Sequence, residues 1–251
     1  MPSDSHLAGK TAIITGASGL IGASVARQLG EAGVNIIAGY HQDASSIAQL
    51  AKDIEAKGGA CRPVQADFNQ PGEADRLKKA ALESFGTVDI VIAAAGRTER
   101  GPALMTNIAK EQALWSLNCQ ACFSVVRSAL RPMMASGWGR VVVIGSRAGI
   151  TGLPGQAAYA ATKAALHAWI SSVAFEIGAR GITINAVAPG AVRNPKQTTY
   201  SKAEDDAICD RIAMKRLAEA EEIAAAVVFL CSPQASYITG SVLNVDGGAR
   251  F

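Results

Sequence analysis

Short apolar runs rich in β-branched residues alternate with longer segments of helical periodicity along the whole chain, and this alternation restricts the fold more than any other feature. Strands of a parallel sheet covered on both faces read as unbroken apolar runs. Strand–helix alternation of this kind predicts a doubly wound α/β fold. The predicted strands are 11–15, 35–40, 60–65, 88–93, 140–144, 183–188 and 242–245, and the predicted helices lie near 20–32, 44–58, 70–85, 106–135, 156–179 and 219–231.

The length and composition fit one such domain. A chain of 251 residues is long enough for one α/β domain or two small ones. Its residues are 49% apolar and 18% charged, which favours a large buried core and excludes a disordered chain. Because no linker or internal repeat interrupts the pattern, we expect a single Rossmann-type domain over residues 1–251, with a seven-stranded parallel sheet and helices on both faces.

Charge and cysteine usage exclude several function classes. The formal charge of +3 is spread along the chain without a long Lys/Arg run, so we expect no nucleic-acid partner. No apolar run reaches membrane-spanning length and residues 1–10 lack a signal-peptide core, which predicts a soluble cytoplasmic protein that does not bind membranes. Five cysteines without secretory context predict no structural disulfide. Cys119-Gln-Ala-Cys122 lacks the second pair of a zinc site, so we expect no metal; two buried thiols or a redox pair remain open.

A glycine-rich turn follows the first predicted strand. It reads Thr15-Gly-Ala-Ser-Gly-Leu-Ile-Gly22 and leads into the first predicted helix. Such a turn lets the backbone approach a pyrophosphate, and the helix N-terminus adds amide donors and a favourable dipole. Glycines also serve ordinary tight turns, but the strand-to-helix position favours dinucleotide binding. The candidate residues are Gly16, Ser18, Gly19, Leu20, Ile21 and Gly22.

Tyr159 and Lys163 are four residues apart in a stretch of good helix formers and therefore share one face of a predicted helix. A nearby ammonium favours a phenolate, so we expect Lys163 to lower the pKa of Tyr159. A phenol tuned in this way can exchange a proton with a carbonyl or an alcohol. The pair alone could be two unrelated surface residues. Ser146, at the end of the fifth predicted strand, makes an active site the better interpretation.

Together these residues and several longer stretches resemble the short-chain dehydrogenase/reductase family, and most of all its bacterial 3-oxoacyl-acyl-carrier-protein reductases. The resemblance runs from about Lys10 to Gly248. The stretches that carry it are Ile144-Gly-Ser146, Gln156-Ala-Ala-Tyr-Ala-Ala-Thr-Lys-Ala164, Gly181-Ile-Thr-Ile-Asn-Ala-Val-Ala-Pro-Gly190, Tyr237-Ile-Thr-Gly240 and Leu243-Asn-Val-Asp-Gly-Gly248.

The resemblance implies roles for individual residues. Tyr159 would donate and accept the proton, and Ser146 would hydrogen-bond the substrate carbonyl and stabilise a developing oxyanion. Lys163 would also hold the cofactor ribose, and Asn118 would position a water that links Lys163 to solvent. An exposed polar position is the other interpretation of Asn118. Further implied cofactor contacts are Asp67, Phe68, Ala94, Ala95, Gly96, Pro189, Gly190 and Val192.

Three positions depart from the family pattern. Leu20 replaces the second glycine of the usual turn, and Gly19 precedes it, so we expect a slightly altered turn with cofactor binding intact. Ala93-Ala94 replaces an Asn-Asn pair that normally braces the sheet. Backbone contacts must therefore substitute, or local stability falls. The segment Val192–Pro195 lacks the threonine that normally contacts the nicotinamide carboxamide.

Cofactor choice depends on the end of the second strand. An acid there would bind the ribose 2′-hydroxyl and repel a 2′-phosphate. Tyr40 and His41 stand at this place, which favours NADP(H) over NAD(H), with His41 or Ser18 as a phosphate contact. Asp43 lies close enough to weaken the argument, and His41 could be a solvated loop residue. For Asp67, a helix cap is the alternative to an adenine contact.

The substrate is the least determined part of the prediction. A polar segment near 190–211 is a candidate substrate lid. Arg97, Arg100 and Arg147 could form a basic patch for an acidic acyl-carrier protein, consistent with fatty acid or polyketide biosynthesis. A sugar, polyol, steroid or aromatic alcohol dehydrogenase is the competing enzyme, and a dinucleotide-binding regulator is the competing non-enzyme. The resemblance implies a homotetramer formed through 106–135, 156–179 and the C-terminal strand region, where Phe251 could enter a partner.

Overall fold

The computed structural model describes residues 6–195 and 202–250. Its centre is a seven-stranded, all-parallel sheet in the order β3-β2-β1-β4-β5-β6-β7. This order reverses direction between β1 and β4, and a doubly wound sheet binds its ligands where such a reversal occurs. The strands are β1 (Thr11–Thr15), β2 (Asn35–Tyr40), β3 (Cys61–Gln65), β4 (Ile90–Ala93), β5 (Gly139–Ile144), β6 (Ile182–Pro189) and β7 (Val242–Val245).

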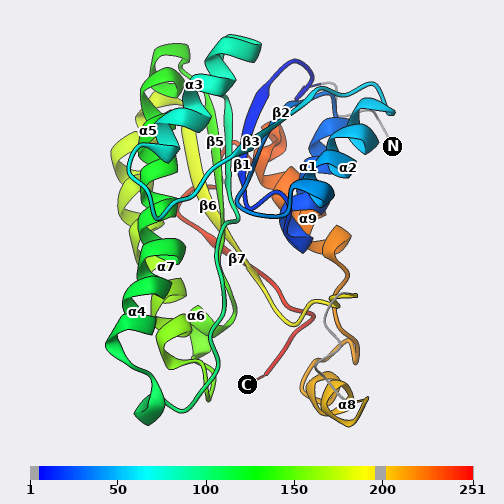
Figure 1. Ribbon diagram of the computed structural model, residues 1–251, viewed down its shortest axis with the longest axis vertical. Coiled ribbons are helices and arrows are strands. Elements are labelled where there is room, and N and C mark those ends of the chain that lie inside the picture. Colours follow the sequence, from blue (N-terminus) through cyan, green and yellow to red (C-terminus); the bar gives the residue numbers. More distant parts are fainter. Residues whose placement is uncertain (1–5, 196–201, 251) are drawn as a thin grey trace.

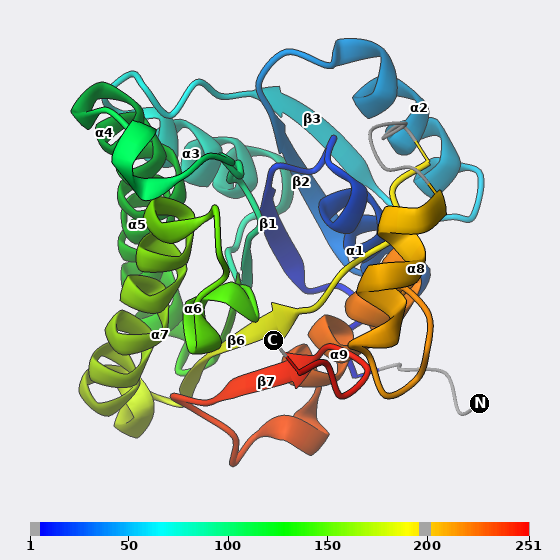
Figure 2. The ribbon, with the colours of Figure 1, turned by 90° about the horizontal axis from the view of Figure 1, so that it is seen from below.

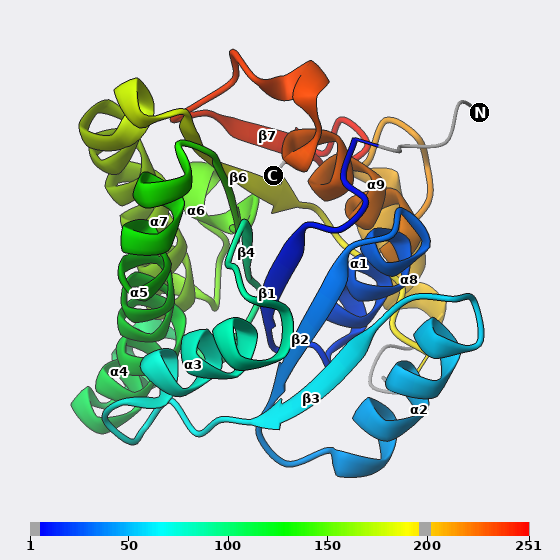
Figure 3. The same cartoon turned by 90° about the horizontal axis from the view of Figure 1, so that it is seen from above.

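Helices cover both faces of the sheet, as the strand–helix alternation predicts. One layer contains α3, α5 and α7, and the other contains α1, α2 and α9 (Figures 1 and 3). The longer helices are α1 (Leu20–Glu31), α2 (Ala44–Glu55), α3 (Glu73–Phe85), α4 (Ile108–Trp115), α5 (Ala121–Ser136), α7 (Ala157–Ile177), α8 (Lys202–Asp210) and α9 (Ala220–Cys231). The short turns are η1 (Ala103–Met105), the π-helical η2 (Ser116–Gln120), α6 (Ala148–Thr151), η3 (Gly178–Arg180) and η4 (Pro233–Ala235).

The core divides into two halves because successive strand residues point to opposite faces of the sheet. Ile13 packs in the half covered by α3, α5 and α7, whereas its neighbour Ile14 packs in the half covered by α1, α2 and α9. Val142 and Val143 of β5 divide in the same way. The inner strands are therefore buried at nearly every position, which is the pattern that made them recognisable, whereas the edge strands β3 and β7 are partly exposed. Pro63 lies in β3, an edge strand, where its missing amide proton costs least.

The predicted elements agree with the structure within about three residues at most ends, with three differences. The predicted helix 106–135 is divided into α4 and α5 by the π-helical turn η2. The short helix α6 was not predicted, and part of the polar segment near 190–211 forms the helix α8. Residues 196–201, part of the predicted lid, and Phe251 lie outside the described residues, so the predictions that concern them are not addressed by the structure.

The cysteines are distributed unevenly between core and surface. Cys61, Cys119, Cys122 and Cys231 are buried, whereas Cys209 on α8 is half-buried. Burial raises the pKa of Cys119 to about 11 and that of Cys122 to about 12. The interpretation of Cys119 and Cys122 as two buried thiols is therefore confirmed. Within the described ranges, no helix is both long and apolar enough to cross a membrane.

Candidate active site

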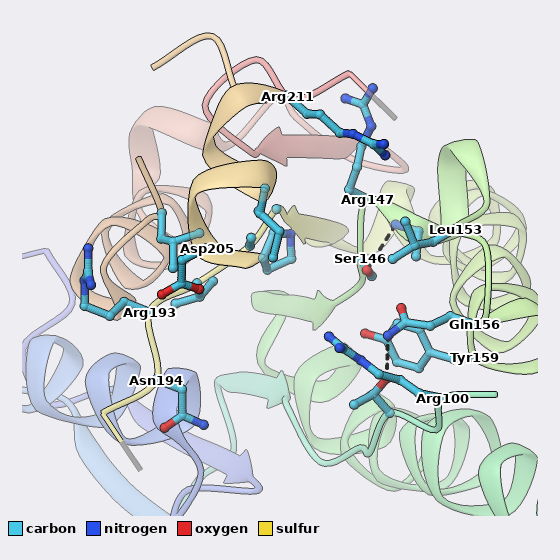
Figure 4. A pocket seen from close by; sticks show the side chains of 18 of the residues that line it. Arg100, Ser146, Arg147, Leu153, Gln156, Tyr159, Arg193, Asn194, Asp205 and Arg211 are labelled. Carbon is cyan, nitrogen blue, oxygen red and sulfur yellow. Dashed lines mark hydrogen bonds between the residues drawn. The ribbon is translucent and has the colours of Figure 1, made fainter. Parts of the chain in front are cut away.

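A cavity of about 640 Å³ opens at the carboxyl-terminal edge of the sheet. It lies where β5 and β6 end, and α6 and α8 stand on either side of the end of β6 (Figure 2). Ser146 and Tyr159 line the cavity (Figure 4). Pro189, Gly190 and Val192 line it as well. The structure thus brings two predicted catalytic residues and three predicted cofactor contacts to one place.

Ser146 and Tyr159 reach the cavity from different elements. Ser146 follows β5, and its hydroxyl accepts a hydrogen bond of 3.1 Å from the Ala148 amide at the start of α6. Tyr159 lies in the first turn of α7, and its side chain lines the same cavity wall as that of Ser146. Two hydroxyls that meet in this way at a cavity wall can both contact a single carbonyl oxygen.

Lys163 lies one helical turn beyond Tyr159 and is 95% buried. Its Nζ donates a hydrogen bond of 2.8 Å to the carbonyl oxygen of Ile144, the last residue of β5. Burial lowers the pKa of Lys163 to about 8. The ammonium lies 5.8 Å from the centre of the Tyr159 ring, so the two side chains are neighbours as their spacing predicts.

The expected effect of Lys163 on Tyr159 is wrong for this structure. Burial raises the pKa of Tyr159, and the nearby Ser146 hydroxyl opposes the rise. The α7 spacing places the ammonium beside the ring, but the phenol is also removed from water, which disfavours the phenolate. The proton of Tyr159 is therefore held by its burial, and Ser146 is the residue that favours its release.

Asn118 is a buried residue that links two segments by hydrogen bonds, and it is not an exposed polar residue. It is only 1% exposed and lies in η2, where the helix widens by one residue. Its Oδ1 accepts from the Arg97 amide at 2.9 Å, and its Nδ2 donates to the Arg97 carbonyl and to Thr162 Oγ1, each at 3.0 Å. Thr162 Oγ1 in turn donates to the Tyr159 carbonyl. Single π-helical turns inside α-helices occur frequently at functional sites.

The glycine-rich turn joins this site through the end of β4. A Cβ on Gly16 would lie 2.9 Å from the Ala95 backbone, and a Cβ on Gly22 would lie 2.3 Å from the Gly16 carbonyl oxygen. Both positions therefore require glycine. Gly19 is the N-cap of α1 and Leu20 is the first helical residue. The leucine therefore replaces a glycine at the start of the helix and leaves the glycines of the turn in place.

Thr15 provides the bracing that the missing asparagines would give. Its Oγ1 accepts hydrogen bonds of 3.1 Å from the amides of both Ala94 and Ala95. One hydroxyl thus links the end of β1 to the segment after β4. Gly96 follows directly, and a Cβ there would lie 3.1 Å from Asn118 Oδ1 and 3.6 Å from Lys163 Nζ. The turn, this segment and the catalytic candidates are therefore linked by direct contacts.

The residues predicted to hold the adenosine end lie beside the ends of β2 and β3. His41 Nε2 is 3.6 Å from Asp67 Oδ1, and both side chains are partly exposed. The helix-cap interpretation of Asp67 is wrong, because the N-cap of α3 is Gly72. Asp67 Oδ1 instead accepts from the Asn69 amide at 3.0 Å. Phe68 packs against the core on the α3 side and does not line the cavity.

Arginines dominate the charged lining of the cavity. Arg100 and Arg147 belong to the predicted basic patch and line the cavity, whereas Arg97 does not. The sequence reasoning missed Gln156, whose Nε2 donates to Thr98 Oγ1 at 3.2 Å, and did not single out Arg211 at the cavity. Gln156 is the N-cap of α7, three residues before Tyr159. Its position in the sequence could therefore have predicted that it lies near that tyrosine.

The residues of the glycine-rich turn suit a dinucleotide. The first turn of α1 contains no acidic residue, and the amides of a first helical turn have no partner within the helix. Such amides, beside a turn that only glycine can form, suit a pyrophosphate. Among the described residues, no group of three or more His, Cys, Asp or Glu side chains is placed to hold a metal ion.

Comparisons with known proteins agree with this geometry. A family model described as Enoyl-(Acyl carrier protein) reductase matches residues 16–250. The chain is 35% identical over 243 residues to a 3-oxoacyl-acyl-carrier-protein reductase of Synechocystis sp., covering 96% of this chain and 97% of the relative. It is 36% identical over 245 residues to 3beta-hydroxysteroid dehydrogenase 1 of Eggerthella lenta, covering 96% and 94%. A blue fluorescent protein from a metagenomic library, solved in complex with NADPH, has a TM-score of 0.89 and 32% identity, covering 96% of this chain and 98% of that one.

Proposed function

The chain belongs to the short-chain dehydrogenase/reductase family of oxidoreductases that act on CH–OH groups, and on this basis we propose that it interconverts a carbonyl and a secondary alcohol with NADP(H). The proposed substrate is a 3-oxoacyl thioester carried by an acyl-carrier protein. The observation that carries the proposal is that Ser146 and Tyr159 line one wall of the cavity together, with the buried Lys163 one turn behind Tyr159.

We assign the proton to Tyr159 and the oxygen contact to Ser146. When the cofactor is bound, its nicotinamide supplies or accepts the hydride. In reduction, the Tyr159 hydroxyl donates its proton to the carbonyl oxygen while the Ser146 hydroxyl stabilises the negative charge that develops there. Lys163 keeps a positive charge near the phenol when protonated, and Asn118 fixes the backbone of Arg97 and, through Thr162, that of Tyr159.

The cofactor is proposed to occupy the surface that runs from the glycine-rich turn to Lys163. Gly16, Gly19 and Gly22 would admit the pyrophosphate, with Ser18, Leu20 and Ile21 at the same turn. The remaining proposed contacts are Tyr40, His41, Asp67, Phe68, Ala94, Ala95, Gly96, Pro189, Gly190 and Val192.

The preference for NADP(H) is supported by the residues at the end of β2. Tyr40 and His41 stand there, and neither is acidic. The carboxylate of Asp67 lies 3.6 Å from the His41 imidazole and so competes with a phosphate for it. The structural neighbour solved with NADPH points in the same direction.

The 3-oxoacyl thioester is supported by the 3-oxoacyl-acyl-carrier-protein reductase among the relatives. The hydroxysteroid dehydrogenase keeps a steroid alcohol as the second candidate. Homotetramer formation and a cytoplasmic location remain predictions from the sequence.

Steady-state kinetics test the proposal. NADPH oxidation is followed with acetoacetyl-acyl-carrier protein, and crotonyl-acyl-carrier protein, which offers only a carbon–carbon double bond, is the matched comparison. Faster turnover of the acetoacetyl substrate is expected. Faster turnover of the crotonyl substrate, or of a 3β-hydroxysteroid with the oxidised cofactor, contradicts the proposed substrate. A higher kcat/KM with NADH than with NADPH contradicts the cofactor assignment. Tight NADPH binding without turnover of any substrate indicates a dinucleotide-binding regulator.

A further inference from the structure

We propose that Arg211, with Arg147 beside it, forms an anion-binding wall in the active-site cavity, and that the acyl chain of the proposed 3-oxoacyl substrate therefore carries an anionic oxygen group, such as a terminal carboxylate. The inference rests on the proposed function, because it names the chemical class of the substrate for the same site. It starts from an imbalance of charge: four arginines line the cavity, and Asp205 is the acid among its described lining residues.

Arg147 and Arg193 have carboxylate partners in the structure. Arg147 is paired with Asp246, and Arg193 with Glu219 at 2.9 Å. Arg211 differs, because within residues 6–195 and 202–250 its guanidinium has neither an ion pair nor a hydrogen bond. Its side chain and that of Arg147 extend toward one another at one end of the cavity (Figure 4).

The Arg147–Arg211 wall thus has two cations and one carboxylate. Among the described residues, Asp246 is the one carboxylate paired with these two guanidiniums, so one of the two positive charges has no carboxylate partner there. Arg147 also has a buried Nε without a hydrogen-bond partner. An added anion between the two guanidiniums would relieve their mutual repulsion and accept hydrogen bonds from both. Guanidinium groups suit this task because they present several donors in a planar fork that matches an anionic oxygen pair.

Backbone contacts hold both arginines in place. Arg211 follows α8, and its carbonyl accepts a hydrogen bond of 2.9 Å from the Arg250 amide near the end of the chain. The next residue, Ile212, is buried against Leu217 and Ala249. The Arg147 amide donates to the Pro189 carbonyl at 3.0 Å. The two side chains therefore start from fixed positions, which reduces the ordering cost of binding.

The position of this wall indicates a small anion and not the surface of a carrier protein. Arg147 directly follows Ser146 in the chain, and its side chain is only 19% exposed. A folded protein cannot enter a cavity of about 640 Å³, which is a usual size for a small-molecule site. The anion must therefore belong to the part of the substrate that enters the cavity with the carbonyl.

Matched acids and esters test the inference. The probes are methyl ketones with a terminal carboxylate separated from the ketone by two to six methylene groups, each paired with its neutral methyl ester. We expect the wild type to prefer the acid at one chain length by about 10- to 100-fold in kcat/KM, as a charge-assisted hydrogen bond would give. Arg211→Ala should bring the acid-to-ester ratio close to one, and Arg211→Glu should bring it below one.

Arg180→Ala is the matched control. It removes an exposed arginine from η3, at the opposite end of β6, and should leave the ratio as in the wild type. Calorimetric titration of the protein alone with the same acids and esters gives a readout that does not require turnover. Tighter binding of the acid that Arg211→Ala abolishes supports the site.

The possible failures can be told apart. If esters and thioesters turn over but acids are no better substrates and bind no tighter, the anion wall is wrong and the proposed function stands. If the preference for acids survives in Arg211→Ala, the anion binds elsewhere and the assignment is wrong. If no carbonyl compound turns over, the proposed function is wrong, and calorimetry alone decides whether Arg211 binds the carboxylate.

Discussion

Lys163 is tied to Ile144 by a hydrogen bond of 2.8 Å between its Nζ and the Ile144 carbonyl oxygen. This bond fastens α7, which carries Tyr159, to the strand end that precedes Ser146. It also holds an amino group in a place where burial lowers its pKa to about 8. Folding the site therefore carries a free-energy penalty for burying the protonated amine of Lys163.

That cost predicts a stability change for Lys163→Met. Below pH 8 both the folded and unfolded states hold the proton, and the penalty is complete. Between pH 8 and the ordinary value of 10.5 the unfolded state holds more protons, so stability rises with pH, and above 10.5 the penalty is gone. The depression corresponds to at most roughly 3 kcal/mol, and the lost hydrogen bond returns about 1 kcal/mol. Urea unfolding should show Lys163→Met to be more stable than wild type at pH 7 by about 2 kcal/mol, with the gain gone by pH 10.5. A less stable variant at pH 7 contradicts the buried charge.

Tyr159→Phe separates chemistry from cofactor binding. Removing the hydroxyl removes the proposed proton donor, and we expect kcat to fall by about 10²- to 10⁴-fold. The dissociation constant for NADPH, measured by fluorescence titration, should stay within about twofold, since the ring and Lys163 remain. Tyr237→Phe, at a fully exposed phenol, is the control and should retain wild-type kcat. Substantial turnover by Tyr159→Phe would refute the role of Tyr159.

Asn118→Ala should destabilise the protein by removing the hydrogen bonds that Asn118 makes to Arg97 and Thr162. Three hydrogen bonds disappear and the Arg97 amide loses its partner, which predicts a loss of roughly 3 kcal/mol in the free energy of unfolding. Asn107→Ala is the matched control, because Asn107 Oδ1 makes one exposed capping bond of 2.9 Å to the Lys110 amide. That change should cost about 1 kcal/mol. Equal losses in chemical denaturation would contradict this role of Asn118.

Gly22→Ala should disrupt the glycine-rich turn, whereas Gly19→Ala should not. The added methyl group would lie 2.3 Å from the Gly16 carbonyl oxygen in the first variant and 3.1 Å in the second. We expect Gly22→Ala to lose roughly 3 kcal/mol of stability and Gly19→Ala less than about 1 kcal/mol. Thermal unfolding measures both changes. Similar behaviour of the two variants would show that the turn tolerates a side chain at Gly22.

Thr15→Val tests the substitute for the missing asparagines. Valine has nearly the same shape but leaves the amides of Ala94 and Ala95 without their acceptor. A loss of about 2 to 4 kcal/mol is expected, since each amide left unpaired in this partly buried segment costs about 1 to 2 kcal/mol. Thr11→Val is the control, because the buried Thr11 Oγ1 has no hydrogen-bond partner. Denaturant midpoints that change equally in the two variants would contradict the bracing role of Thr15.

The fold could be predicted from the sequence because its strands are buried on both faces and read as plain apolar runs. The position of Ser146 followed from the same pattern, since it stands where the fifth run ends. The π-helical turn around Asn118 could not be predicted, because it depends on contacts with Arg97 and Thr162 from distant segments. The predicted lowering of the Tyr159 pKa was wrong for a similar reason. Helical spacing places Lys163 beside Tyr159, but it does not reveal how deeply the phenol is buried.

The uneven distribution of the cysteines has a practical consequence for experiments on α8. Burial raises the pKa of Cys61 and Cys231 to about 12, and it also raises the pKa of Cys119 and Cys122. Four of the five cysteines therefore resist alkylation in the folded protein. Cys209 is left as the reactive position, on a helix at the cavity edge. A maleimide fluorophore should therefore attach there in the wild-type chain, with no need for a cysteine-free background.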